Sequence, residues 1–72
     1  LRINAVCPGL IDTPMFTQQG EDRERFFSDG AEQHLIPRAG QPEEVASAAI
    51  FLLENRFVTG TIVDVDGGAL SA

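Results

Sequence analysis

An apolar segment near the start of the chain, which ends abruptly at a Pro-Gly pair, constrains the fold more than any other feature. Residues 1–7 (Leu-Arg-Ile-Asn-Ala-Val-Cys) have the apolar character of a buried strand in a parallel sheet. Pro8 ends this strand because proline has no N–H to give a sheet ladder, and Gly9 lets another group approach closely. Thr13 supplies a hydroxyl just beyond. Ligands of open α/β sheets bind outside the carboxyl ends of the strands, so residues 8–14 are predicted to form one wall of a ligand crevice.

A helix and a second strand are predicted in the last third of the chain. The helix spans residues 42–54, because Pro42 suits the first helical position and apolar residues follow at helical spacing. Its predicted core stripe consists of Val45, Ala48, Ala49, Leu52 and Leu53. Residues 61–66 are rich in β-branched residues and predict a strand, with Asp66 helping to fix the following glycine turn. Strand, helix and strand imply a crossover between parallel strands, and therefore an α/β fold.

Residues 15–36 have a different character. They are polar and charged, are interrupted by Gly20 and Gly30, and carry isolated large apolar groups. We expect short helices joined by mobile segments. A connection of this length between core elements is more often functional than not. The alternative is an ordinary surface insertion with its aromatic side chains packed beneath it.

Three single residues invite a catalytic or redox interpretation, and each has a plainer one. Asp12 is expected to be a solvated loop aspartate. His34, the only histidine, lies in an acidic stretch with no obvious partner, so a surface histidine is favoured over a general base. Cys7 is expected to be a small buried residue of the strand. A single cysteine makes no internal disulfide and fits a reducing, cytoplasmic location, and no metal site is predicted around it.

Size and charge limit the possible partners. The 72 residues carry a formal net charge of −6, which disfavours nucleic acid and anionic membranes. No apolar run approaches the ~20 residues of a membrane span. A chain this small buries only about 60% of its unfolded surface, so we expect it to be part of a larger protein. Alone, it is predicted not to fold cooperatively, because its two strands would lack the sheet between them.

Three segments resemble, in the same order, the classical short-chain dehydrogenase/reductase family. They are residues 2–14 (Arg-Ile-Asn-Ala-Val-Cys-Pro-Gly-Leu-Ile-Asp-Thr-Pro), 37–46 (Pro-Arg-Ala-Gly-Gln-Pro-Glu-Glu-Val-Ala) and 59–68 (Thr-Gly-Thr-Ile-Val-Asp-Val-Asp-Gly-Gly). The resemblance concerns only the C-terminal part of that family's domain. It implies the C-terminal part of a doubly wound, Rossmann-like parallel sheet. It also implies an NAD(P)-dependent oxidoreductase that transfers hydride between nicotinamide and a carbonyl or alcohol substrate.

The resemblance also assigns site residues in this chain. The cofactor, NAD or NADP, is expected at residues 8–14, where the backbone at Ile11 would hold the nicotinamide carboxamide and the Thr13 hydroxyl would bond nearby. The implied cofactor-binding residues are Pro8, Gly9, Leu10, Ile11 and Thr13. Residues 15–36 would form a substrate lid, with Met15 and Phe16 touching an apolar part of the substrate. Alternatively, Thr13 belongs to a simple turn or caps the following helix.

The chain lacks two residue types that the resembled family needs for catalysis. It has no tyrosine and no lysine, so the family's Tyr-x-x-x-Lys pair does not lie here and no catalytic residue is predicted. The alternative is a non-redox or non-catalytic relative of the same fold, or a fragment that acts only as an assembly surface. The expected partners are the remainder of the domain and further copies of the protein. A homodimer or homotetramer would use the last strand and the helix over 42–54, from which Phe51 would point outward.

Overall fold

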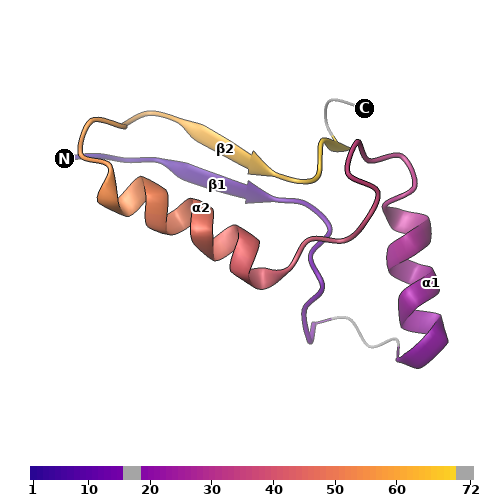
Figure 1. Ribbon diagram of the computed structural model, residues 1–72. Helices are drawn as coiled ribbons and strands as arrows, with labels where there is room; N and C mark the ends of the chain where they lie inside the picture. Colours follow the sequence, from indigo (N-terminus) through magenta and orange to yellow (C-terminus); the bar gives the residue numbers. More distant parts are fainter. Residues whose placement is uncertain (16–18, 70–72) are drawn as a thin grey trace.

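The described part of the chain contains a two-stranded parallel sheet. The computed structural model describes residues 1–15 and 19–69. Its elements are β1 (Ala5–Pro8), α1 (Gly20–Gly30), α2 (Pro42–Glu54) and β2 (Ile62–Val65). β1 and β2 are hydrogen-bonded neighbours, with Val6 opposite Val63, so the predicted parallel arrangement is confirmed. The expectation that other strands separate the two is wrong, because the connection through α2 returns the chain directly to the edge of β1 (Figure 1).

The helix α2 runs back along one face of this sheet (Figure 1). Side chains alternate between the faces of a strand, and the half-buried Val6, Val63 and Val65 accordingly alternate with exposed neighbours. Cys7 and Asp64 lie opposite each other in the register and are exposed. The expectation of a buried Cys7 is therefore wrong, because its side chain lies on the face that α2 does not cover.

The bounds of α2 agree with the predicted residues 42–54, and most of its predicted core stripe faces the sheet. Leu52 is buried, and Val45, Ala48 and Ala49 are half-buried. The prediction that Leu53 is a core residue is wrong, because Leu53 is 73% exposed. It belongs to the last turn of α2, where its carbonyl accepts a hydrogen bond from Arg2, a residue that precedes β1.

Side chains from the residues before β1 anchor the far end of α2. The guanidinium of Arg2 donates to the carbonyls of Leu52 at 2.8 Å, Leu53 at 3.0 Å and Val58 at 3.0 Å. The amide of Asn4 also donates to the Val58 carbonyl, at 3.1 Å. The last carbonyls of a helix have no intrahelical partner, and a positive charge there is favoured by the helix dipole. Arg2 therefore joins the end of α2 to the start of the sheet.

The region over residues 15–36 contains one helix in its described part. This helix, α1, stands beyond the carboxyl ends of both strands (Figure 1). Phe27 and Ala31 are buried, and the ring of Phe26 meets that of Phe27 edge-on at 5.3 Å. The helix is therefore held by a small apolar anchor at its C-terminal end, next to the loop that follows β1.

Candidate functional site

The loop that follows β1 begins with a close contact between the residues that leave the two strands. The Gly9 N–H donates to the Val65 carbonyl at 2.9 Å. A Cβ on Gly9 would lie 2.8 Å from the Cβ and 2.9 Å from the Cα of Asp66. The close approach predicted at Gly9 is thus made by the backbone that follows β2. Gly9 positions the loop by allowing the ends of the two strands to meet.

The backbone of Ile11 is held in place by hydrogen bonds that Gly40 makes to the residues on either side of it. The Gly40 N–H donates to the Leu10 carbonyl at 2.9 Å, and the Asp12 N–H donates to the Gly40 carbonyl at 2.9 Å. Peptide groups of successive residues in an extended segment point to opposite sides. The N–H and C=O of Ile11 therefore point away from Gly40, and no group in residues 1–15 or 19–69 bonds them. Its side chain is buried, so one donor and one acceptor are held side by side at a fixed position.

Thr13 and Asp12 are both bonded to Arg23 of α1. The Arg23 guanidinium forms an ion pair with the Asp12 carboxylate and donates to the Thr13 carbonyl at 2.9 Å. The expectation of a merely solvated Asp12 is therefore wrong. The helix-capping alternative for Thr13 is also wrong, because the N-cap of α1 is Gln19. Sequence reasoning missed Arg23, since ten residues separate it from Thr13 and no local pattern joins them.

The other predicted site residues differ in how close they lie to the loop and in how exposed they are. Pro8 is the last residue of β1, and Leu10 is half-buried beside a cavity. Met15 is 83% exposed and, with Pro14, lies in a turn. Phe16 lies outside the described residues. The loop over residues 8–14 therefore gathers its predicted residues at one edge of the sheet, whereas the predicted substrate contact at Met15 is turned to the surface.

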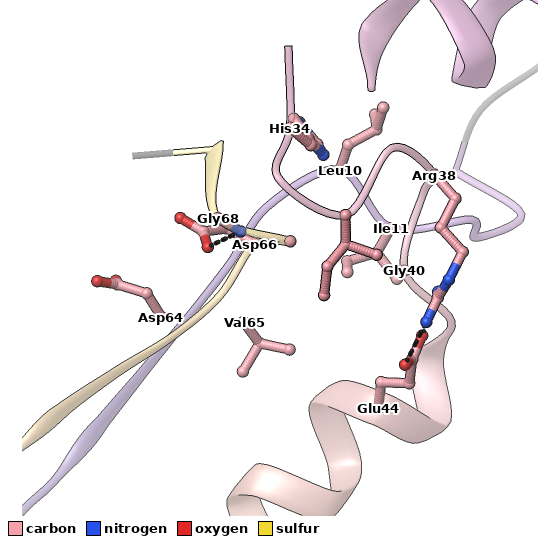
Figure 2. Close-up of a pocket in the computed structure, with 12 residues that line it drawn as sticks. Leu10, Ile11, His34, Arg38, Gly40, Glu44, Asp64, Val65, Asp66 and Gly68 are labelled. Atoms are coloured by element: carbon pink, nitrogen blue, oxygen red, sulfur yellow. Dashed lines mark hydrogen bonds and ion pairs between the residues drawn. The ribbon is translucent and has the colours of Figure 1, made fainter. Parts of the chain in front are cut away.

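A cavity of about 290 Å³ lies between this loop, β2 and the start of α2 (Figure 2). Leu10, Ile11, Ile36 and Val65 give it apolar walls. Polar groups reach it from His34, from the turn after β2 and from the Arg38–Glu44 pair (Figure 2). Gly40 lines it beside Ile11.

His34 differs from its predicted surface position. Its side chain is half-buried, and its Nδ1 atom is buried without a hydrogen-bond partner in the described part of the chain. Gly67, with φ of +63°, allows this approach, because a Cβ there would lie 3.2 Å from Nδ1. Asp66 fixes this turn as predicted, since its Oδ1 accepts the Gly68 N–H at 2.9 Å. The Gly67-Gly68 pair was the available signal that another segment packs here.

Arg38 and Glu44 link the connector to the first turn of α2. The guanidinium donates to both carboxylate oxygens, at 2.8 and 2.9 Å, and the Gln41 N–H donates to Oε1 at 2.9 Å (Figure 2). The hydrogen bond from Arg38, followed by that from Gln41, lowers the pKa of Glu44 from 4.5 to about 2. These bonds fix Gly40, which lies between Arg38 and Gln41, and so fix the backbone that presents Ile11.

This ion pair predicts an acid-sensitive contribution to stability. The pKa of Glu44 is lower in the folded protein, so its stabilisation is complete above about pH 4.5 and is lost as the pH falls towards 2. Glu44→Gln should therefore flatten the dependence of the unfolding free energy on pH between those values. Urea unfolding at several pH values checks this, with Glu43→Gln, an exposed neighbour, as the matched control. Identical pH profiles for the two variants would contradict the assignment.

Two findings concern the described residues as a whole. None of the helices in residues 1–15 and 19–69 is long and apolar enough to cross a membrane. Within the same residues, no group of three His, Cys, Asp or Glu side chains is placed to hold a metal ion.

The fold and this loop together define a class of protein: an α/β unit with unbonded loop backbone at the carboxyl end of a parallel strand, the edge at which ligands of open α/β sheets bind. Residues 1–70 match the family model described as Enoyl-(Acyl carrier protein) reductase. The chain belongs to the short-chain dehydrogenase/reductase family, as its relatives also show.

Among the relatives, the short-chain dehydrogenase/reductase ATR9 of Stachybotrys chlorohalonatus is 42% identical over 69 residues, which cover 96% of this chain and 27% of that protein. The 3-oxoacyl-(acyl-carrier-protein) reductase FabG of Thermotoga maritima is 42% identical over 71 residues, 94% of this chain and 27% of the relative. The chain thus spans about a quarter of the length of these curated relatives.

Solved structures give the same result for the fold. A small-chain dehydrogenase in complex with NADPH superposes with a TM-score of 0.85 at 33% identity, over 100% of this chain and 33% of that one. The ligand-free aldohexose dehydrogenase of Thermoplasma acidophilum superposes with a TM-score of 0.86 at 40% identity, over 99% of this chain and 32% of that one. The predicted Rossmann-like α/β fold is confirmed for this part of the domain.

Proposed function

We propose that this chain is the nicotinamide-side part of an NAD(P)-dependent oxidoreductase that acts on a carbonyl or alcohol substrate. The relatives support this proposal, since they carry dehydrogenase and reductase names and one superposed structure holds NADPH. When bound, the nicotinamide would supply the hydride chemistry. The chain has no tyrosine and no lysine, so we assign it binding and positioning roles only, in a cytoplasmic enzyme.

The observation that carries the proposal is the free backbone of Ile11. A carboxamide presents one carbonyl oxygen and one NH₂ group, and it is matched by an adjacent backbone N–H and C=O. Ile11 offers this pair, because Gly40 bonds the Leu10 carbonyl and the Asp12 N–H on either side of it. The buried Ile11 side chain also restrains the rotation of this stretch of backbone. Thr13, two residues further on, adds a half-buried hydroxyl. The residues present therefore fit the nicotinamide end of the cofactor.

Thr13→Ala should weaken the binding of NADH or NADPH about two- to tenfold, because one neutral hydrogen bond contributes about 0.5–1.5 kcal/mol. The measurement is a fluorescence titration of the native polypeptide that carries this sequence (hereafter the native polypeptide). Thr13→Ser retains the hydroxyl and should keep the affinity of the wild type. Equal affinities for Thr13→Ala and the wild type would remove Thr13 from the cofactor site. Absence of any nicotinamide binding by the wild type would overturn the proposed function.

We further propose that residues 15–36 form the substrate lid, with Met15 and Phe16 contacting an apolar part of the substrate. The position of α1 beyond the carboxyl ends of β1 and β2 supports this role, since ligands of open α/β sheets bind at that edge. The exposed Met15 is available to a ligand that approaches the loop. Such a lid would exclude water from the bound substrate when it closes.

Assembly is proposed to use the outer surface of α2 and the edge of β2. Phe51 is 52% exposed on this surface, and Ile50 and Leu53 are exposed near it. In a homodimer or homotetramer, Phe51→Glu would place a charge in an apolar contact and should shift the protein to smaller species. Sedimentation at matched concentrations checks this, with Leu35→Glu as an exposed control outside α2. A folded Phe51→Glu variant with the mass of the wild type would contradict this interface.

A further inference from the structure

Arg23 joins α1 to the loop that follows β1, and it also packs on a ring of its own helix. Its guanidinium pairs with the Asp12 carboxylate and donates to the Thr13 carbonyl at 2.9 Å. It also lies over the ring of Phe27, 5.0 Å from the ring centroid. Phe27 is buried, so the guanidinium has an apolar wall on one side and the loop on the other.

Asp12 is the point at which two restraints meet. Its backbone N–H is bonded to the Gly40 carbonyl at 2.9 Å, and its carboxylate is paired with Arg23. The same guanidinium holds the peptide carbonyl of Thr13 and so restrains the backbone of the residue that carries the hydroxyl. A rotation of the loop at Asp12 or Thr13 would therefore pull on Arg23 and on α1.

A second contact, at the other end of α1, makes this helix follow the loop. A Cβ on Gly30 would lie 2.8 Å from Cδ2 of Leu10, so the C-terminal end of α1 packs directly on the residue before Ile11. The loop over residues 8–14 is thus touched by both ends of the helix. Of these two contacts, the one through Arg23 is polar and half-exposed, with side-chain exposures of 25% for Arg23 and 37% for Asp12, and is weakened by salt.

We propose that Arg23 is a positioning residue that couples the lid helix α1 to the cofactor-binding loop. Cofactor contacts at Ile11 and Thr13 would restrain the loop further, and Arg23 would transmit that added restraint to α1. This inference rests on the proposed function, because it assigns the loop to the cofactor and α1 to the lid. Arg23 itself touches neither the cofactor nor the reacting atoms in this scheme.

Hydrogen exchange of the native polypeptide, with and without saturating NADPH or NADH, tests the coupling. In the wild type, the cofactor should slow exchange both at residues 8–14 and in α1. In Arg23→Gln and in Asp12→Asn, the protection at residues 8–14 should persist, whereas the added protection of α1 should fall about three- to tenfold. The exchanged pair Asp12→Arg with Arg23→Asp should restore part of it. Arg25→Gln, an exposed arginine on the same helix, should behave as the wild type.

The outcomes separate this inference from the proposed function. If the wild type binds cofactor and Arg23→Gln protects α1 as the wild type does, the coupling role is overturned and the proposed function stands. If Arg25→Gln loses the cofactor-induced protection of α1 to the same extent, the loss is caused by the changed charge of the helix. The coupling role of Arg23 is then again overturned. If the wild type binds no nicotinamide cofactor, the proposed function and the inference both fall.

Discussion

Gly9→Ala should destabilise the native polypeptide by about 1–3 kcal/mol, the usual range for inserting a methyl group into a packed site. The added Cβ would lie 2.8 Å from the Cβ and 2.9 Å from the Cα of Asp66. Part of this obstacle is backbone, so a side-chain rotation does not relieve it. The ends of β1 and β2 would have to separate, which would also break the hydrogen bond from Gly9 to Val65. Urea unfolding measures the loss.

Gly30→Ala is the matched control for Gly9→Ala. A Cβ on Gly30 would also meet an atom at 2.8 Å, but that atom is Cδ2 of Leu10, the far end of a flexible side chain. Alanine also favours the helix that Gly30 ends. Its unfolding free energy should stay within about 0.5 kcal/mol of the wild type. If both substitutions were neutral, the packing of Gly9 on Asp66 would not hold the strand ends together.

Arg2→Ala should cost about 2–3 kcal/mol of unfolding free energy. Charge-assisted hydrogen bonds contribute about 1.5–3 kcal/mol each when buried, and the three made by Arg2 are only part-buried and share one side chain. The carbonyls of Leu52, Leu53 and Val58 would be left to water, and the end of α2 would lose its tie to the sheet. The same urea titration that serves for Gly9 measures this change.

Arg56→Ala is the control for Arg2→Ala, because Arg56 is exposed just beyond α2 and makes no hydrogen bond within the described residues. Its effect should be within about 0.5 kcal/mol. If Arg2→Ala lowered the unfolding free energy no more than Arg56→Ala does, the three hydrogen bonds from Arg2 to carbonyls would contribute nothing beyond what water supplies.

Local signals predicted the parts of the fold that local physics determines. The bounds of α2 follow from Pro42 and from an apolar pattern of helical spacing. Both signals depend only on residues that are close together in the sequence. The bounds of the first strand were predicted less accurately: the strand was predicted over residues 1–7, and β1 is Ala5–Pro8. Its pairing depends on a partner more than fifty residues away, and the residues before Ala5 meet a loop, where the Gly60 N–H donates to Ile3.

The candidate site was predictable in outline and not in its connections. The Pro-Gly pair and Thr13 predicted a loop after the first strand, and the structure has a loop there, at the carboxyl end of β1. The roles of Asp12 and His34 depend on groups distant in sequence, Arg23 for one and Gly67 for the other, and no periodicity or spacing encodes these contacts. The free backbone of Ile11 likewise became visible only when Gly40 was found bonded on both sides of it.

The central claim is that the backbone of Ile11 holds the nicotinamide carboxamide, and its amide signal during a cofactor titration tests this most directly. In the ¹⁵N-labelled native polypeptide, NADH or NADPH should shift the Ile11 amide resonance saturably and slow its hydrogen exchange. The Gly40 amide, already bonded to the Leu10 carbonyl, should keep its exchange rate. Saturable cofactor binding that leaves the Ile11 amide unchanged in both shift and exchange would contradict the claim.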